Sequence, residues 1–305
     1  MRLKLFQFKP LGKITEIPNS QSIFGMICYA YSEKYGQVEL EAMLARFYNG
    51  NPDFIISSFF LHDLLPMPLD ISHYHPNLSK EKLIKLKNAK KIKYISKSIF
   101  QEYLNNLDDF NKKYYENIFN NNYVIVNNEY LVKREEQKKF ENYIFKEEMH
   151  IRNYVDEKEL FYNNCKYYHK DVAFDLYVKI NNDEEKITNL LKDLHYVSIG
   201  GGKSIGYNLF SVIDNSEIEF VNHKENKILL SMATVSDEID YEKSYYKLET
   251  LHNKFNNAIN RVYKNCVTVF KAGSTLNTTK DVIGSFLKND IDGKTKYSNY
   301  LGLLI

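Results

Sequence analysis

The segment from residue 172 to residue 213 constrains the fold most, because its hydrophobic period changes twice within a short length. Apolar residues alternate with other residues at positions 172, 174, 176, 178 and 180, which is typical of a half-buried strand. They then fall on one face of a helix, at Ile187, Leu190, Leu191 and Leu194. A glycine-rich segment follows, and Tyr207–Ile213 predicts another strand. This order of elements predicts an α+β unit.

Similar elements are predicted on both sides of this segment. Before it, the sequence predicts a strand at Leu3–Phe8, helices that end near Gly36 and Phe47, and a strand at Phe54–Phe60. After it, the pattern predicts a strand at Lys227–Val235, a helix whose apolar face begins with Leu248 and Leu251 and continues to Val262, and a strand at Val267–Ala272. We therefore expect an α+β fold with two tandem ferredoxin-like (RRM-like) domains, at residues 1–215 and 216–305.

The region of about residues 77–148 has a different composition, rich in Lys and Asn, and predicts an insertion in the first domain. It contains one clear hairpin pattern, Tyr123–Val126 and Tyr130–Val132, joined through Asn127 and Asn128. Asparagine tolerates positive φ angles, so the Asn-Asn pair is an acceptable tight turn. We expect the insertion to act as a thumb-like element.

Several classes of protein are disfavoured by composition. The three cysteines, Cys28, Cys165 and Cys266, are far apart and form no Cys-x-x-Cys pair, so the sequence predicts neither a disulfide framework nor a zinc site. No apolar run approaches the roughly 20 residues of a membrane span, and the N-terminus lacks the apolar core of a signal peptide. These features predict a cytoplasmic protein that does not associate with membranes and needs no metal or cofactor.

The glycine-rich segment Ile199–Phe210 contains four of the chain's 12 glycines, at Gly200, Gly201, Gly202 and Gly206. Their backbone amides are free of side-chain obstruction, and Lys203 and Ser204 add a charge and a hydroxyl, so the segment could cradle a phosphate. It fits neither a Walker A loop, which needs glycine where Val197 stands, nor a dinucleotide fingerprint, which needs glycine at Ile205. A tight connection that needs glycine for its geometry alone explains the pattern equally well.

Positive charge is concentrated in one stretch. Residues 79–98 carry eight Lys against one acidic residue, Glu81, a local charge of +7 in a chain whose net charge is only +2. Lys90 and Lys91 lie at the centre of this stretch. Such a stripe suits sequence-independent contact with a nucleic-acid backbone, although a solvated lysine-rich surface is the simpler explanation.

The predicted start of the first helix contains Asn19, Ser20 and Ser22. Short polar side chains at this position usually cap the free amides of the helix. An exposed helix N-terminus also attracts anions, so these residues are candidates for phosphate contact as well.

The histidines require a test for acid–base catalysis. His73 and His75 flank Tyr74 in what reads as a surface loop, and His195 ends a predicted helix, where a cation complements the helix dipole. His150 lies beside Arg152, where it could contact RNA or pack in the structure. No carboxylate cluster accompanies the histidines, so we expect no catalytic and no metal-binding residues.

The glycine-rich segment resembles the glycine-rich loop of the RAMP (repeat-associated mysterious protein) superfamily of CRISPR RNA-binding proteins. It departs from that motif at Asn208, where glycine is common. Further stretches resemble one branch, the Cas5-group subunit of type III-A effectors (Csm subunit four). These are Pro18–Met26, Phe54–Phe60, Leu65–Leu69, Lys90–Ile95, His150–Asn153, Leu160–Tyr162, Lys271–Ser274 and Tyr300–Leu303.

This resemblance implies a non-catalytic subunit that binds the 5′ handle of crRNA and contacts target RNA only indirectly. It implies two protein partners, the large polymerase-like effector subunit and the backbone RAMP subunit. The RNA-binding residues would be Asn19, Ser20, Ser22, Lys90, Lys91, His150, Arg152, Gly200, Gly201, Gly202, Lys203, Ser204, Gly206 and Tyr207. Two alternatives stay open: a Cas6-like, metal-independent endoribonuclease that processes repeat RNA, and the equivalent capping subunit of a type III-B complex.

Overall fold

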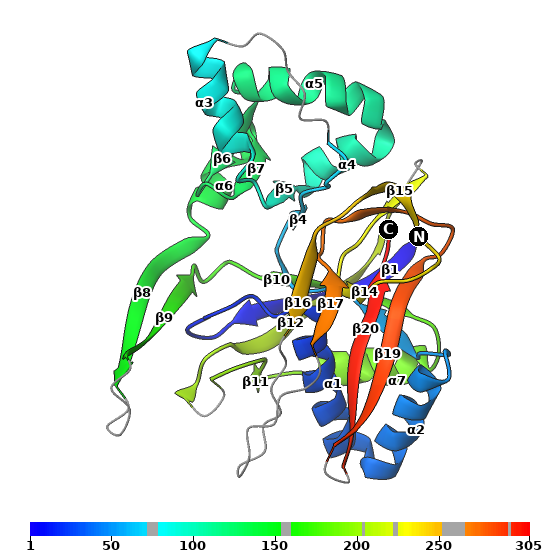
Figure 1. The fold of residues 1–305 in the computed structure, drawn as a ribbon. Coiled ribbons are helices and arrows are strands. Elements are labelled where there is room, and N and C mark those ends of the chain that lie inside the picture. Colours follow the sequence, from blue (N-terminus) through cyan, green and yellow to red (C-terminus); the bar gives the residue numbers. More distant parts are fainter. Residues whose placement is uncertain (72–78, 154–159, 203–204, 222–224, 252–265, 292–293) are drawn as a thin grey trace.

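The computed structural model describes residues 1–71, 79–153, 160–202, 205–221, 225–251, 266–291 and 294–305. Its N-terminal half is organised around one antiparallel sheet (Figure 1). The strands of this sheet are β1 (Arg2–Pro10), β2 (Phe54–Ile56), β3 (Phe60–Leu61), β10 (Phe174–Ile180), β11 (Val197–Ser198) and β12 (Leu209–Glu219). The fold is α+β, as expected.

The order of the strands is that of a ferredoxin-like domain. Strand β1 lies between β12 and β10, and β2 pairs with the outer side of β10, so the four main strands follow the spatial order fourth, first, third, second. β11 extends the edge beside β12, and β3 also pairs with β10. The segment of changing period that predicted the α+β unit is therefore the second half of this sheet.

Three helices cover one face of the sheet: α1 (Ser20–Tyr35), α2 (Gln37–Tyr48) and α7 (Glu184–Lys192). The first two are separated only by Gly36, whose φ of 91° requires glycine and whose amide donates to the Ser32 carbonyl at 2.8 Å. Both predicted helices, and the end of the first at Gly36, are confirmed. Successive side chains of β1 point to opposite faces of the sheet. Phe6 and Phe8 lie on the face that the helices cover, and they pack with them in the larger core cluster.

The opposite face of the sheet is also buried. Leu3, Leu5 and Tyr177 belong to a second core cluster that includes residues of the intervening region and of the C-terminal strands, such as Phe220 and Leu303. An RRM binds RNA on an open sheet face with exposed aromatic rings. This chain has no such open face along β1 and β10, so nucleic acid would have to bind at loops and edges.

Residues 62–173 connect β3 to β10 and form what we call the insertion, whose helices and four-stranded sheet lie at the top of Figure 1. Its sheet has the order β4-β5-β7-β6, with strands β4 (Leu64–Pro66), β5 (Tyr94–Ser96), β6 (Tyr123–Val126) and β7 (Tyr130–Lys133). Its helices are α3 (Lys80–Ala89), α4 (Lys97–Asn105), α5 (Leu107–Phe119), α6 (Gln137–Glu141) and the 3-10 turn η1 (Arg134–Glu136). A long hairpin of β8 (Ile144–Asn153) and β9 (Leu160–Tyr168) leads back to the first sheet.

The predicted hairpin in this region is confirmed. β6 and β7 pair with Val126 opposite Tyr130, and the turn residues Asn127 and Asn128 have φ angles of 51° and 56°. Two positive φ angles in a two-residue turn match the right-handed twist of the paired strands. The predicted extent of the insertion, 77–148, stays a prediction; the sheet order assigns the wider connection 62–173 to it.

The C-terminal part consists of strands in the residues described. They are β13 (Asn226–Ile228), β14 (Ala233–Thr234), β15 (Asp240–Tyr245), β16 (Leu248–Leu251), β17 (Val267–Phe270), β18 (Thr275–Asn277), β19 (Val282–Ile291) and β20 (Lys294–Leu303). The final hairpin lies along the helix layer, where Phe286 packs against Phe24 and Phe47. A second ferredoxin-like domain with a boundary at residue 215 stays a prediction; β12 itself runs through that position.

The predicted helix that begins at Leu248 is wrong in its first turn. Leu248–Leu251 form β16, which pairs with β17 from Leu248 opposite Phe270 to Leu251 opposite Val267. Leucines three residues apart fit a helix, but here the partner strand supplies backbone hydrogen bonds, and the exposure of β16 alternates as in a strand. The rest of that predicted helix, 252–262, lies outside the described residues. None of the helices described is long and apolar enough to span a membrane.

Candidate nucleic-acid interface

The glycine-rich segment forms the connection between β11 and β12 at the edge of the first sheet. Gly200, Gly202 and Gly206 have φ angles of 86°, 75° and 74°, which side-chain-bearing residues rarely adopt. The Gly202 carbonyl accepts hydrogen bonds from the amides of Ile205 and Tyr207, at 3.1 and 3.2 Å. The loop is therefore a defined, tightly wound structure in the residues described, and glycine is required by its geometry.

Asn208 holds this loop in place. Its φ is 54°, and its side chain is only 3% exposed. The side-chain oxygen accepts from the Thr15 amide at 2.9 Å, while the side-chain NH₂ donates to the Thr15 hydroxyl at 3.0 Å and to the Gly201 carbonyl at 3.1 Å. The departure from the usual glycine thus keeps the positive φ and adds a connection to the loop after β1.

The backbone of Gly202 lies close to the ring of Tyr207. A Cβ atom at Gly202 would stand 2.9 Å from the Tyr207 ring, closer than real contacts allow. The Tyr207 carbonyl accepts from the Ser198 hydroxyl at 2.8 Å, and the ring itself is almost fully buried. Tyr207 therefore packs under the backbone of the glycine loop. Its ring could stack on an RNA base only if the loop moved.

The loop of residues 11–15 brings positive charge to the glycine loop. Lys13 places its ammonium 5.9 Å from the centre of the Tyr207 ring and 6.0 Å from that of Tyr167 in β9. A hydrogen bond to the Tyr167 hydroxyl raises the pKa of Lys13, so its ammonium stays charged. Lys146, in β8, lies 6.0 Å from the same Tyr167 ring. Lys146 also pairs with Glu148, so the positive charge beside the glycine loop comes from Lys13.

The β8–β9 hairpin is joined to this surface by backbone hydrogen bonds. Ile14 and Lys166 exchange both amide–carbonyl bonds, at 3.0 and 2.8 Å. The hairpin then extends away from the sheet (Figure 1). We call the glycine loop (199–208), the loop 11–15 and the base of this hairpin the glycine-loop surface. It combines a glycine-rich backbone, the ammonium group of Lys13 and aromatic rings, the chemistry that binds single-stranded nucleic acid.

The predicted site residues fall into separate groups. Gly200, Gly201, Gly202, Gly206 and Tyr207 belong to the glycine-loop surface, whereas Lys203 and Ser204 lie outside the described residues. His150 and Arg152 belong to β8 by their backbone, and their side chains are outside the described part. Sequence reasoning missed Lys13, Thr15 and Tyr167. The strand order could have indicated Lys13 and Thr15, because it places the end of β1 beside the start of β12.

The start of α1 is a capped helix. Asn19 accepts a hydrogen bond from the Ser22 amide at 2.9 Å, the ordinary N-cap interaction. Ser20 is 2% exposed, and its hydroxyl accepts from the amide of Met232 at 3.2 Å. Ser20 therefore ties the first domain to the C-terminal part, and its buried hydroxyl is not presented to a ligand.

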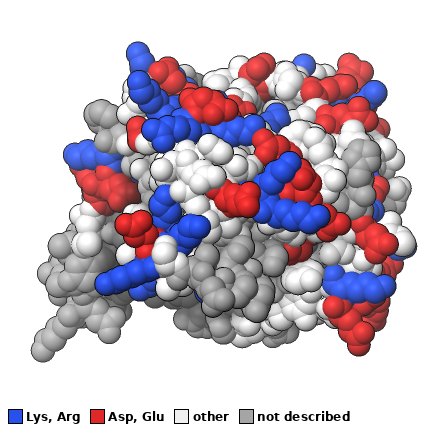
Figure 2. All heavy atoms as spheres, turned by 90° about the horizontal axis from the view of Figure 1, so that it is seen from above, with Lys and Arg blue, Asp and Glu red and all other residues white. Residues whose placement is uncertain are grey.

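Lys90 and Lys91 directly follow the last turn of α3, in the insertion, and Figure 1 shows this helix well separated from β11. Other lysines of the stripe are engaged within the insertion: Lys85 donates to the Phe119 carbonyl at 2.9 Å, and Lys93 pairs with Glu129 at 2.5 Å. Figure 2 views the molecule from the side of the insertion and shows basic and acidic side chains next to each other. The visible part of this face is a mixed surface, without a continuous basic stripe.

One histidine that sequence reasoning did not consider lies where the insertion joins the first sheet. His62 bonds through Nδ1 to the buried carboxylate of Asp175 at 2.9 Å, and this bond raises the pKa of His62. Tyr143 donates to the His62 carbonyl at 3.0 Å, and Lys139 pairs with Asp63. The cluster connects the β1–β10 sheet to α6 and β8. These hydrogen bonds and ion pairs account for the positions of the side chains involved, so the cluster is a structural junction between the insertion and the first sheet.

Among the residues described, no three His, Cys, Asp or Glu side chains gather where they could hold a metal ion. His195 is bonded to the Ser211 hydroxyl at 2.9 Å, and His73 and His75 lie outside the described residues. The glycine-loop surface offers backbone amides, an ammonium group and aromatic rings, which are groups that can bind nucleic acid.

A domain with a ferredoxin-like sheet and a glycine-rich loop before its last strand is the arrangement of the RAMP superfamily, and the family model of that superfamily matches residues 15–211. The match covers more than half of the chain, so the chain belongs to the RAMP superfamily, as its sequence resemblance indicated. The matched range contains the insertion and nearly all of the glycine-loop surface.

Solved structures share the fold over the whole chain. A chain of the Csm3–Csm4 subcomplex in the type III-A CRISPR-Cas interference complex has a TM-score of 0.66 at 19% identity, covering 97% of this chain and 98% of that one. A chain of the Csm1–Csm4 cassette in complex with pppApA has a TM-score of 0.60 at 16% identity, covering 99% and 97%. A comparison with curated protein sequences gave no match.

Proposed function

We propose that this chain is the RAMP subunit that caps a type III-A CRISPR effector and binds the 5′ handle of its crRNA at the glycine-loop surface. The observation that carries the proposal is the glycine loop itself, wound through three positive φ angles and fixed to the loop 11–15 by Asn208. A handle is single-stranded RNA, which proteins hold through backbone contacts, cations and stacking. The role is one of binding, without a catalytic step or cofactor.

The closed sheet supports this placement. Both faces of β1 and β10 are buried, by the helices on one side and by the insertion and C-terminal strands on the other. RNA would therefore follow the edge at β11 and β12, where the loop amides and Lys13 lie. The β8–β9 hairpin, which carries His150 and Arg152, would act as the thumb beside the strand.

Two protein partners belong to the proposal: the large polymerase-like subunit on one side and the backbone RAMP subunit on the other. Both structures of similar fold contain Csm4, one together with Csm3 and the other together with Csm1. Contact with target RNA would be indirect, through the assembled effector. The capping subunit of a type III-B complex is the related alternative, and the identity of the large partner distinguishes the two.

The test is to co-purify the chain with its large partner and measure binding of crRNA with and without the repeat-derived handle. We expect tighter binding with the handle, and a loss of that difference in the double variant Gly202→Asp, Lys203→Ala. Val38→Ala, an exposed position on α2, is a control that should keep it. Equal binding of both RNAs by the unaltered protein contradicts the proposal. RNA recovered after incubation with EDTA should be intact; cleavage would favour the endoribonuclease alternative.

A further inference from the structure

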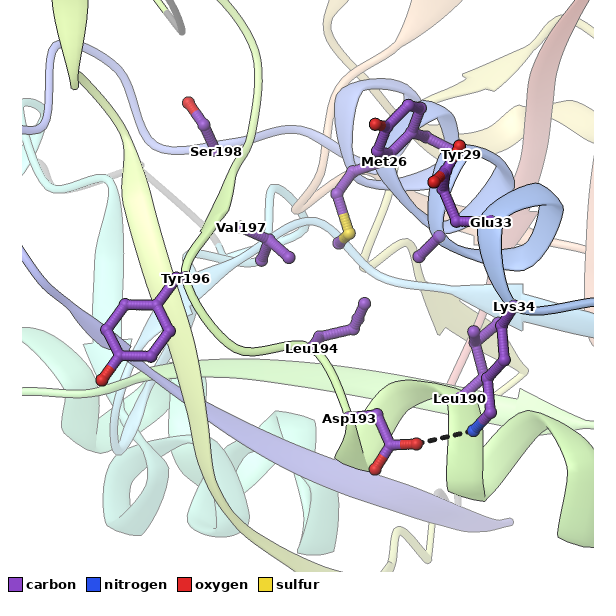
Figure 3. A pocket seen from close by; sticks show the side chains of 11 residues that line it. Met26, Tyr29, Glu33, Lys34, Leu190, Asp193, Leu194, Tyr196, Val197 and Ser198 are labelled. Atoms are coloured by element: carbon purple, nitrogen blue, oxygen red, sulfur yellow. Dashed lines mark hydrogen bonds and ion pairs between the residues drawn. The ribbon is translucent and has the colours of Figure 1, made fainter.

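A pocket of about 710 Å³ lies between α1 and the chain that leads into the glycine loop (Figure 3). Met26, Leu194 and Val197 point into its centre from different elements. The ion pair between Lys34 and Asp193, at 2.6 Å, closes one side. The volume falls within the range of small-ligand sites, and an apolar floor with a few polar groups at the rim is their usual lining.

Two tyrosines at this pocket are unusually exposed. Tyr29 on α1 is 67% exposed, and Tyr196, before β11, is 77% exposed. Tyr196 also has a φ of 56°, in the left-handed region that tyrosine rarely adopts. Its ring points away from the other lining side chains (Figure 3), so packing does not compensate for this backbone conformation. Backbone strain that no packing interaction of the side chain offsets indicates a functional position.

A short stretch of chain joins the pocket to the glycine-loop surface. Val197 and Ser198 line it and form β11, and Gly200 follows two residues later. Ile199 between them is fully buried, which fixes the distance between the pocket and the loop. A strand held at the glycine loop would therefore carry one of its bases to the mouth of this pocket.

We propose that this pocket receives a single unpaired nucleobase of the RNA bound at the glycine loop. The base would insert over Met26 and Leu194 and stack at the rim on Tyr29 and, after a rotation of its exposed side chain, on Tyr196. Glu33 and the Lys34–Asp193 pair offer an acceptor and a donor for its polar edge. The inference rests on the proposed function, because it requires RNA at the glycine loop, and it deepens that function by naming where one base is read.

The experiment places the fluorescent base 2-aminopurine at each handle position in turn and measures its emission when the full chain, with its large partner, binds the RNA. Stacking quenches this fluorophore, so we expect one position to be quenched on binding. Tyr29→Ala and Tyr196→Ala should remove the quenching at that position and weaken binding by about fivefold or more. Tyr48→Ala, an exposed tyrosine on α2 outside the pocket, is the matched control and should change neither.

A further variant separates function from structure. Tyr196→Gly removes the ring and also relieves the positive φ, so the protein should be at least as stable to heat while it loses the quenching. A loss of thermal stability in this variant would show that the ring has a structural role and would contradict the inference.

The remaining outcomes are distinct. If handle RNA fails to bind the unaltered protein, both the proposed function and the base pocket are wrong. If RNA binds but no position is quenched, the pocket proposal fails and the proposed function stands. If the tyrosine variants keep RNA binding and quenching but no longer hold the large partner, the pocket is a protein-docking site and the base proposal is overturned.

Discussion

The glycine-loop surface and the lysine-rich helix α3 both suggested nucleic-acid binding, but they are built in different ways. The glycine loop is fixed by backbone hydrogen bonds and by the buried side chain of Asn208. Helix α3 carries its lysines on an exposed surface, and Lys85 is already bonded to the neighbouring α5. A fixed backbone can position an RNA strand, whereas mobile ammonium groups supply only attraction that salt weakens. Local charge density is therefore a poorer guide to the site than backbone geometry.

The largest effect is expected at Asn208. Asn208→Ala removes three close hydrogen bonds and leaves a side-chain-bearing residue at positive φ, at a cost of about 3 kcal/mol in the free energy of unfolding. The loop should also lose its position, so the affinity for RNA should fall by about tenfold or more. A tenfold loss corresponds to about 1.4 kcal/mol in the free energy of binding. Chemical denaturation and crRNA binding measure the two effects.

Asn208→Gly is the matched variant for that experiment. It restores the residue common in the family's loop and tolerates the positive φ, so only the hydrogen bonds to Thr15 and Gly201 are lost. We expect it to lie between the unaltered protein and Asn208→Ala in both measurements. Equal effects of the two substitutions would show that the backbone angle does not matter here.

Neighbouring glycines give a second, somewhat smaller effect. Gly202→Ala places a methyl group against the Tyr207 ring at a φ of 75°, whereas Gly201 has no atom within 4 Å of its Cβ position. Gly202→Ala should therefore weaken RNA binding several-fold and lower thermal stability, while Gly201→Ala should leave stability nearly unchanged. Thermal melts and RNA titrations of both variants test this. Identical behaviour of the two would mean that the loop is not held as the structure shows.

Much of the first domain could be predicted from its sequence. The periods of residues 172–194 predict the strand β10 and the helix α7 correctly, and Asn127–Asn128 adopt the angles that their side chains favour. The expectation that this strand is half-buried is wrong, because the second core cluster covers its other face as well. Each of these signals is local, because it depends on side-chain periodicity or on one residue's preferred φ. Local signals survive in a single sequence.

The missed features depend on contacts between distant residues. Thr15 and Asn208 are separated by 193 positions, and no pattern near either one encodes their hydrogen bonds. Helices α4 and α5 were missed because their buried faces are largely aromatic and lie within a polar sequence rich in Lys and Asn. Tyr103 and Tyr114 are buried in the second core cluster, although their neighbours in the sequence are mostly polar. At Leu248, periodicity fits a helix and a strand equally, and pairing with β17 decides the outcome.

The junction between the two regions should respond to pH. Asp175 raises the pKa of His62, so the protonated histidine stabilises the folded state. This contribution is complete below the unfolded pKa of about 6.5 and is lost as the pH rises through the higher folded value. Burial opposes ionisation of Asp63, but Lys139 and His62 hold its pKa below the ordinary value, so its contribution is lost in acid. The melting temperature should therefore be highest in an intermediate pH range, and it should fall both at lower pH and at higher pH.

The variant His62→Gln isolates the upper limit of this window. It should flatten the decline of the melting temperature as pH rises above about 6.5, and Asp175→Asn should do the same with a larger overall loss, because Tyr177 and the Asp63 amide also bond to that carboxylate. An unchanged decline in both variants would exclude this pair as its source. RNA binding at neutral pH should change little, since the junction is separate from the glycine loop.

The smallest effects are expected from single charges, and they compare the two surfaces directly. Lys13→Ala removes an ammonium group that lies over the Tyr167 and Tyr207 rings, beside the glycine loop. The double variant Lys90→Ala, Lys91→Ala removes two charges from the insertion, at the C-terminal end of α3. Each phosphate contact contributes about 0.9 to the slope of log affinity against log salt for duplex DNA and about 0.7 for single strands. Lys13→Ala should therefore lower the slope by somewhat less than one and weaken binding a few-fold at low salt.

The double variant should leave the slope nearly unchanged, and a larger loss from Lys90 and Lys91 than from Lys13 would place the RNA on the insertion instead.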